Sequence, residues 1–371
     1  MTFINKSICF LVFSGYNERA VWALCRFFSQ RKISFYIVAR DKYDRLIYSP
    51  WSERIVLVRY NKDLNIKIFK KIVERIKIKE KVDKIIYCPT TEFLNKFVLD
   101  NREELEYLDI NVPLPERKTY SLLTNKISNT AFFEKIGIES PKIYSLKDAI
   151  LLEKCVFKPR KNIVNNRTLY PIICLTKKDI YESRKKINEK IWFVQEFIKG
   201  QSLYLCMYVR KNGLFCYFWQ ANLLQQPNGK SIVLARSIDS PKVVSENLIA
   251  DSLHQLGFYG PIMIEFIIDE SGVPKFIEAN PRFWGPLQLA IDTCPQIINN
   301  FIFESIEGED SYTDADELCS PLKINWYAWH DEIVKNLSIL KRYPLVNDLT
   351  DEEIIKISQY WDVYSGTKYN R

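Results

Sequence analysis

The sequence predicts a multidomain protein that opens with an α/β unit built on a parallel sheet and continues with an α+β part that contains antiparallel strands. A chain of 371 residues is too long for one compact core, so two or three domains are expected. An apolar strand at 6–13, a helical stretch at 18–30 and a strand at 33–39 follow one another, which is typical of a parallel sheet. At 257–290 a strand, a turn and a returning strand predict an antiparallel hairpin.

The composition is that of a globular protein and excludes several function classes. Hydrophobic residues make up 47% and charged residues 26% of the chain, and no apolar run reaches the roughly 18 residues that span a bilayer, so no membrane partner is expected. Nine cysteines without a CxxC pair predict buried thiols in a reducing compartment, which indicates the cytoplasm. Two histidines are too few for a histidine-rich zinc site. The net charge of +8 comes largely from a lysine-rich helix, which we interpret as a solvated face without a nucleic-acid partner.

The hairpin carries the residues that indicate chemistry. Side chains alternate between the two faces of a strand, so Glu278 and Asn280 in the second strand project to the same side, and Glu265 in the first strand can reach that side as well. Two carboxylates and one carboxamide suit Mg²⁺, which completes its shell with substrate phosphates. The alternative is a pair of solvated acids, but both glutamates have apolar neighbours, and a buried carboxylate needs a partner.

This stretch also resembles a known family. The run Glu265 … Glu278-Ala279-Asn280-Pro281-Arg282 is similar to the metal-binding signature of the ATP-grasp superfamily, and residues 283–290 resemble its subgroup of predicted ATP-dependent carboligases. The resemblance covers residues 115–305 and implies a two-subdomain ATP-grasp fold after the N-terminal unit. The implied domains are an N-terminal α/β pre-ATP-grasp domain at 1–114, a small ATP-grasp subdomain with a linker helix at 115–200, a large subdomain with the metal hairpin at 201–310, and a C-terminal helical extension at 311–371.

The resemblance implies ATP as the cosubstrate, with Mg²⁺ as the metal and Mn²⁺ as its alternative. The metal ligands would be Glu265, Glu278 and Asn280, and Arg282 would be the catalytic residue. The ATP-binding positions would be Lys126, Lys158, Gln195, Glu196, Phe197, Ile198 and Arg236. Lys126 is expected in the first turn of a helix capped by Thr124, where a cation opposes the helix dipole unless an anion is bound there; an exposed lysine is the alternative.

The sequence departs from the family at the loop that should cover the phosphates. The family has a glycine- and serine-rich loop there, whereas residues 161–168 contain no glycine. Glycine allows the closest approach of backbone amides to phosphate, so side chains would have to substitute. A helix that begins at Pro241 and ends before Gly257 is expected to lead into the hairpin.

The resemblance implies a ligase that joins a carboxylate to an amine through an acyl phosphate, with an amino acid, a peptide or an acidic sugar among the substrates. One alternative is a kinase that stops after phosphoryl transfer. Another is a nucleotide-binding ATP-grasp protein without turnover, which the glycine-free loop suggests. A homodimer is compatible with the sequence.

Overall fold

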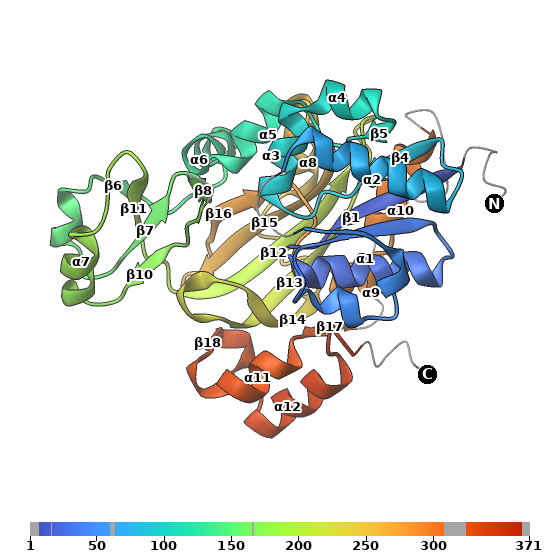
Figure 1. The fold of residues 1–371 in the computed structure, drawn as a ribbon. Helices are drawn as coiled ribbons and strands as arrows, with labels where there is room; N and C mark the ends of the chain where they lie inside the picture. Colours follow the sequence, from blue (N-terminus) through green and yellow to red (C-terminus); the bar gives the residue numbers. More distant parts are fainter. Residues whose placement is uncertain (1–6, 16, 60–63, 165–166, 308–323, 366–371) are drawn as a thin grey trace.

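The computed structural model describes residues 7–15, 17–59, 64–164, 167–307 and 324–365. Figure 1 shows a parallel sheet in the N-terminal unit at one end of the molecule and a small antiparallel sheet at the other. A long antiparallel sheet lies between them. This arrangement confirms the predicted α/β opening followed by an α+β part.

The N-terminal sheet is parallel, with the strand order β3-β2-β1-β4-β5. Its strands are β1 (Ile8–Phe13), β2 (Phe35–Ala39), β3 (Ile55–Val58), β4 (Lys84–Tyr87) and β5 (Ile110–Asn111). The helices of this unit are α1 (Glu18–Gln30), α2 (Ile66–Lys79), α3 (Glu92–Asp100) and α4 (Arg102–Tyr107). Helices cover both faces of such a sheet, which explains why β1 and β2 are continuous apolar runs rather than alternating ones.

Two short helices, α5 (Arg117–Thr124) and α6 (Lys126–Lys135), connect the N-terminal unit to the small sheet. The side chain of Asn125 accepts hydrogen bonds from the backbone N–H groups of Ile127 and Ser128 and so caps α6. Thr124, the predicted cap, is instead the last residue of α5. Gly137 follows α6 with a φ of 83°, the left-handed conformation that glycine adopts without strain.

The small sheet is antiparallel in the order β10-β7-β11-β6. Its strands are β6 (Ile143–Tyr144), β7 (Cys155–Pro159), β10 (Ile172–Cys174) and β11 (Trp192–Glu196), and α7 (Lys177–Arg184) packs on it. Thr176 and Asp179 form a capping box at the start of α7. A separate hairpin, β8 (Ile163–Val164) and β9 (Arg167–Thr168), extends from β7.

The long sheet is antiparallel, with the order β16-β15-β12-β13-β14-β17. Its main strands are β12 (Gly200–Val209), β13 (Phe215–Gln225), β14 (Ile232–Ile238), β15 (Gly260–Asp269) and β16 (Pro274–Asn280). The last two form the predicted hairpin. The helix before them, α8 (Glu246–Gln255), begins after Ser245, whose side chain caps it, and not at Pro241 as the sequence suggests. Helices α9 (Leu287–Thr293) and α10 (Gln296–Glu307) follow the hairpin.

The C-terminal segment contributes more than helices. Its helices α11 (His330–Asn336) and α12 (Asp351–Tyr360) lie beside the long sheet in Figure 1. In addition, β17 (Trp326–Ala328) pairs with β14, and β18 (Lys341–Arg342) pairs with β13. Residues 311–323 and 366–371 of the predicted extension lie outside the described part of the chain. The segment therefore belongs to the long sheet and does not merely pack on it.

The N-terminal unit and the long sheet share one hydrophobic core. Phe10 of β1 packs against Phe28 of α1, with ring centroids 4.8 Å apart, and also against Phe301 of α10. Phe283, just after the hairpin, meets the same Phe301 edge to face. The chain after β16 is thus held by residues from both units.

The cysteines depart at one position from the expectation drawn from the composition. Seven cysteines, at positions 9, 25, 88, 155, 174, 206 and 216, are free and buried, as expected. Cys294 is disulfide-bonded, against the expectation of thiols throughout, and Cys319 lies outside the described residues. None of the helices that the structure describes is long and apolar enough to cross a bilayer.

One aromatic stack joins α6 to the hairpin and gives a stability prediction. The rings of Phe133 and Phe276 are both fully buried and stack with centroids 4.0 Å apart. Replacing Phe133 with alanine is expected to lower the free energy of unfolding by about 3–5 kcal/mol, because a large cavity would remain. Urea denaturation checks this value. Phe132→Ala is the matched control, since this ring is only half-buried, and an equal loss in both variants would contradict the assigned role of the stack.

Candidate active site

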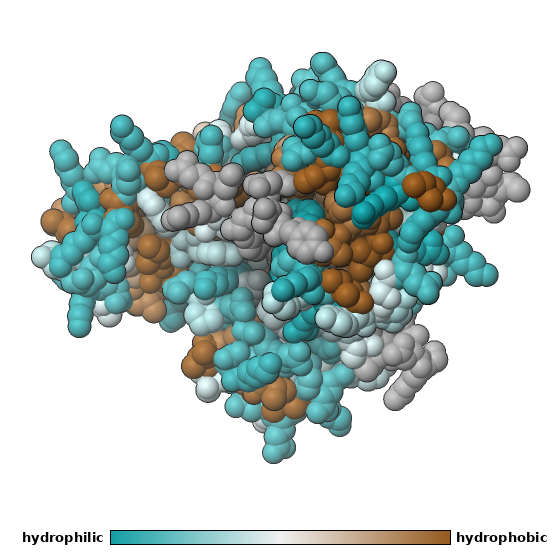
Figure 2. Space-filling model, viewed as in Figure 1, coloured by the Kyte–Doolittle hydropathy of each residue, from teal (hydrophilic) through white to brown (hydrophobic). Residues whose placement is uncertain are grey.

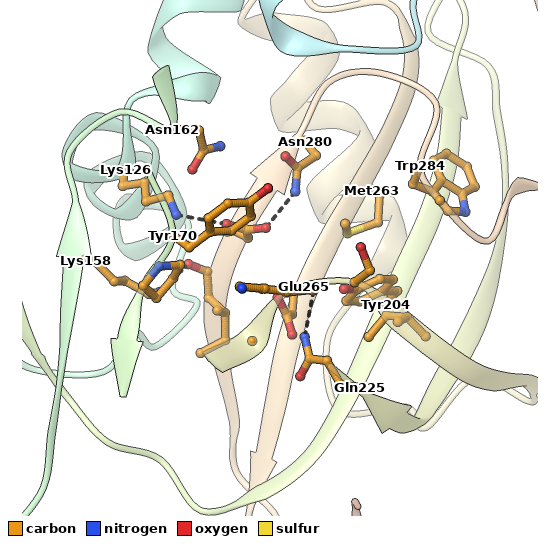
Figure 3. Close-up of a pocket in the computed structure, with 18 of the residues that line it drawn as sticks. Lys126, Lys158, Asn162, Tyr170, Tyr204, Gln225, Met263, Glu265, Asn280 and Trp284 are labelled. Atoms are coloured by element: carbon orange, nitrogen blue, oxygen red, sulfur yellow. Dashed lines mark hydrogen bonds and ion pairs between the residues drawn. The ribbon is translucent and has the colours of Figure 1, made fainter. Parts of the chain in front are cut away.

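A cavity of about 310 Å³ opens between the small sheet and the long sheet. Residues of β7, β10 and β11 line one wall, and residues of β15 and β16 line the other. Side chains of the N-terminal unit, among them Asn17, Arg19 and Glu92, close one end. Most of the residues that the sequence selects therefore border one cavity, and Figure 3 shows how several of them converge on it.

The two glutamates of the hairpin lie side by side on one wall of the cavity. Glu265 of β15 and Glu278 of β16 are direct cross-strand partners, and Asn280 donates a hydrogen bond of 2.8 Å from Nδ2 to Glu278 Oε1. The bond shows that Glu278 and Asn280 project to the same side, as predicted. Burial raises the pKa of Glu265, and the charge of Glu278 raises it further. Two neighbouring buried carboxylates repel each other when both are ionised, so a cation between them would favour the doubly ionised state.

A chain of polar side chains from the neighbouring strands positions Glu265. Gln220 Nε2 donates to Asn222 Oδ1 at 2.7 Å, and Asn222 Nδ2 donates to Ser202 Oγ at 2.7 Å. Ser202 Oγ in turn donates to Glu265 Oε1 at 2.8 Å. Gln220, Asn222 and Ser202 are essentially inaccessible to water, so the network fixes one carboxylate oxygen and leaves the other for a ligand. Nothing in the sequence marked these residues.

Two buried lysines, Lys126 and Lys158, lie beside Glu278. Lys126 Nζ is 3.1 Å from Glu278 Oε2, and Lys158 Nζ donates to the carbonyl oxygen of Ile277 at 3.1 Å. Burial lowers the pKa of Lys158, and the charge of Lys126 adds to the effect. For Glu278 burial acts against ionisation, but the charges of Lys126 and Lys158 outweigh it and hold the pKa below its usual range. Lys126 and Lys158 place positive charge in this part of the cavity, which suits a bound polyanion.

Arg282 lies where the hairpin meets the N-terminal unit. Its Nη2 donates to Asn280 Oδ1 at 3.2 Å, and its Nη1 donates to the carbonyl oxygen of Phe283 at 2.9 Å. Asn17, which precedes α1, donates to the same carbonyl oxygen at 3.0 Å. The N-terminal unit therefore holds the loop that carries Arg282, and each terminal nitrogen of the guanidinium makes one hydrogen bond that orients it.

The sequence-predicted adenine segment borders the cavity. Gln195, Glu196, Phe197 and Ile198 all line it. Gln195 Nε2 donates to the carbonyl oxygen of Pro141 at 3.3 Å, which leaves Oε1 as the acceptor of this side chain. Glu196 Oε2 accepts from the backbone N–H of Lys142 at 3.1 Å. Apolar residues also line the cavity, among them Val156, Ile173, Ile198, Ile267 and Ile277.

The glycine-free loop forms the hairpin β8–β9 beside the cavity. Asn162 Nδ2 donates to Glu92 Oε2 of α3 at 3.0 Å, which connects this loop to the N-terminal unit. Tyr170, which follows the loop, also lines the cavity. Asn165 and Asn166 lie outside the described residues. The loop that lacks glycine is therefore held to the N-terminal unit by a side-chain hydrogen bond.

One predicted ATP-binding residue, Arg236, does not line the cavity, and one residue that the sequence did not indicate, Lys341, does. Arg236 is not among the described residues that line the cavity, and its guanidinium lies 5.9 Å from the ring centre of Trp326. Lys341 of β18 lines the cavity, where burial lowers its pKa and the charge of Glu265 opposes that shift. The position of Lys341 could not be predicted from the sequence, because a strand of two residues is too short to show an alternating pattern of apolar and polar residues.

The donor set fits a hard divalent cation. Among the described residues no group of three or more His, Cys, Asp or Glu is placed to hold a metal ion. Two facing carboxylates and a carboxamide fit Mg²⁺ when substrate phosphates supply the remaining oxygens. The amide oxygen of Asn280 accepts from Arg282 and its amide nitrogen donates to Glu278, so this oxygen is the atom through which Asn280 would hold a metal.

Sequence comparison finds neither a matching family model nor a matching curated protein. Comparison of structures finds solved proteins with the same fold. The biotin carboxylase domain of a 2-oxoglutarate carboxylase from Hydrogenobacter thermophilus, a complex with MgADP and bicarbonate, matches with a TM-score of 0.63 at 13% identity, over 88% of this chain and 76% of that one. N5-carboxyaminoimidazole synthetase from Staphylococcus aureus, complexed with ADP, matches with a TM-score of 0.61 at 15% identity, over 90% and 85%.

The L-amino acid ligase from Bacillus licheniformis matches with a TM-score of 0.58 at 12% identity, over 88% of this chain and 80% of that one. All three are ATP-grasp proteins. The chain therefore has the ATP-grasp fold that its hairpin signature implied, with the preceding α/β unit included in the match.

Proposed function

We propose that the protein is an ATP- and Mg²⁺-dependent ligase that joins a carboxylate to an amine and releases ADP and phosphate. The observation that carries this proposal is the facing pair Glu265 and Glu278, with buried Lys126 and Lys158 on one side and the fixed guanidinium of Arg282 on the other. The structural neighbours support the class, because they include an L-amino acid ligase and an ADP-bound synthetase.

Each group has a task that its position supports. Glu265, Glu278 and Asn280 would hold the metal, which neutralises charge on the transferring phosphoryl group. Lys126 and Lys158 would bind the phosphates, and the segment 195–198 with its apolar surroundings would bind adenine. Arg282 would hold the carbonyl oxygen of the reacting carboxylate, a task suited to its planar fork. Arg236 keeps a role only if the chain rearranges on binding nucleotide.

The reaction requires no side-chain nucleophile. A substrate carboxylate oxygen attacks the γ-phosphorus of ATP, the bond to the β-phosphate oxygen breaks, and ADP leaves. The amine nitrogen then attacks the carbonyl carbon of the acyl phosphate, and phosphate departs with the C–O bond electrons while the nitrogen loses a proton. Negative charge develops on the carbonyl oxygen in this second step, where a preorganised cation is most effective.

The wider setting is part of the proposal. The substrates would be a small carboxylate and a small amine, drawn from amino acids, peptides or acidic sugars. The cytoplasm supplies ATP, and the seven free buried thiols fit a reducing compartment. A homodimer is compatible with this function.

Two measurements test the proposal together. Calorimetry is expected to show binding of ATP that depends on Mg²⁺, because both metal and phosphates have partners in the cavity. ADP release is then followed with carboxylates alone and with carboxylates plus amines, and amide formation in the second case is the expected result. A folded protein without ATP affinity contradicts the proposal. Acyl phosphate release that amines do not affect indicates the kinase, and binding without any ADP indicates the protein without turnover.

A further inference from the structure

Arg19, near the start of α1, is a buried cation that the proposed chemistry does not use. Its side chain lines the cavity, only 8% of the residue is exposed, and no hydrogen-bond acceptor lies near Nη1. It makes no hydrogen bond or ion pair with the residues that the structure describes. Burying a charge without a partner is costly, so such a residue needs an anion from outside the chain.

The neighbours of Arg19 hold its position without satisfying its charge. The guanidinium stacks over Trp329, 4.6 Å from the ring centre, which orients the plane but leaves the N–H groups at its edge available. Glu18, the adjacent acid, lies outside ion-pair distance. Burial and the nearby Asp44 raise the pKa of Glu18, and Arg19 is only the least of the three arginines that lower it.

Arg19 lies at the Arg282 end of the cavity. Asn17, two residues earlier, shares the carbonyl oxygen of Phe283 with Arg282. A Cβ atom built on Gly285 would lie 3.2 Å from Arg19 Nη2, so the guanidinium touches the loop that follows Arg282. A Cβ atom at position 285 would be in tight contact with the guanidinium, which would have to shift slightly.

A second donor without an acceptor lies in the same loop. Trp284 is 1% exposed and lines the cavity, and among the described residues nothing accepts a hydrogen bond from its Nε1. In Figure 3 Trp284 lies on the far side of Asn280 and Glu265 from Lys126 and Lys158. The phosphate-binding lysines and this pair of donors therefore mark opposite ends of the cavity.

We propose that Arg19 and Trp284 bind a carboxylate of the substrate that does not react, so that the enzyme selects acids with a second negative group. The inference rests on the proposed function and specifies its substrate class. A carboxylate takes two hydrogen bonds from a guanidinium edge and accepts a further one from an indole N–H. The reacting carboxylate lies at Arg282, and the second carboxylate lies toward α1.

The test compares ligands that differ by one carboxylate. L-Glutamate against L-glutamine represents amino acids, and D-glucarate against D-glucuronate represents sugar acids; each pair keeps one carboxylate for the reacting position. Binding to the full chain is measured by calorimetry in the presence of Mg²⁺ and ADP. We expect the dicarboxylate of at least one pair to bind about 10- to 100-fold more tightly, the range of one charged hydrogen-bonded contact.

The variants are Arg19→Met, Arg19→Lys and the matched control Arg26→Met. Arg26 lies on the same helix with the same 8% exposure, but it donates to Gln288 and to the carbonyl oxygen of Val363 and does not line the cavity. Arg19→Met is expected to abolish the preference, Arg19→Lys to retain part of it, and Arg26→Met to retain it fully.

Two results would overturn the inference: the absence of a dicarboxylate preference in the wild-type protein, and a preference that persists in Arg19→Met. The affinity for Mg²⁺ and ADP is measured in the same samples. If the wild-type protein does not bind Mg²⁺ and ADP, the proposed function itself is contradicted. If it binds them but shows no preference for the dicarboxylate, the inference alone is contradicted. If Arg19→Met does not fold, Arg19→Lys decides, because a preference equal to that of the wild type would show that the fork is not used.

Discussion

Replacing Glu278 with glutamine is expected to reduce ATP turnover by about 10³-fold or more, because a metal that stabilises the transferring phosphoryl group contributes several kcal/mol. The change removes a negative charge opposite Glu265 at nearly constant shape. The amide oxygen can still accept a hydrogen bond from Lys126, now 3.1 Å from the carboxylate, so the fold is expected to persist. The loss should therefore appear in the chemical step.

ADP release and circular dichroism measured in parallel check this result. Glu270→Gln is the matched control, because Glu270 lies in the turn of the same hairpin, is 70% exposed and pairs with Lys199 at the surface. Its activity is expected to equal that of the wild type. Wild-type ADP release in Glu278→Gln would identify Glu278 as a structural acid and remove the metal from this hairpin.

The hairpin shows what a sequence can specify. Alternation along β15 and β16 fixes which side chains share a face, so the convergence of Glu265, Glu278 and Asn280 followed from spacing alone. The same is true of β1-α1-β2, because buried parallel strands are continuous apolar runs. In both cases the information lies within a few consecutive residues.

Contacts between distant segments could not be predicted in this way. The network from Gln220 through Asn222 and Ser202 to Glu265 depends on the register of three strands, which no single segment encodes. Arg19 reaches the cavity only because α1 packs against the loop after β16, more than two hundred residues later in the chain. Such residues look like ordinary polar positions until the sheets are assembled.

Local signals failed where two of them competed. Thr124 and Asn125 are both good capping residues, and the structure uses Asn125 because a separate helix already ends at Thr124. Pro241 follows a serine, as at many helix starts, yet α8 begins after Ser245, and Ser240 instead hydrogen-bonds to Glu246 inside the helix. Boundaries of this kind are decided by packing rather than by local preference.

Replacing Arg282 with lysine is expected to separate the two half-reactions. Lysine keeps the positive charge but loses the fork that now donates both to Asn280 and to the carbonyl oxygen of Phe283. Binding of ATP with Mg²⁺ should remain, because Lys126 and Lys158 supply the phosphate contacts. Amide formation should fall by about 10²- to 10³-fold, the scale of losing one preorganised donor at a developing oxyanion.

The measurement follows ADP release and amide product in parallel for Arg282→Lys and the wild type. Arg117→Lys is the control, since Arg117 is 68% exposed and pairs with Asp100 at the surface. Unchanged amide formation in Arg282→Lys would remove this residue from the mechanism. If the wild type itself releases acyl phosphate that no amine captures, the protein is a kinase. A variant that still makes ADP but little amide places Arg282 at the second step, where negative charge gathers on the carbonyl oxygen.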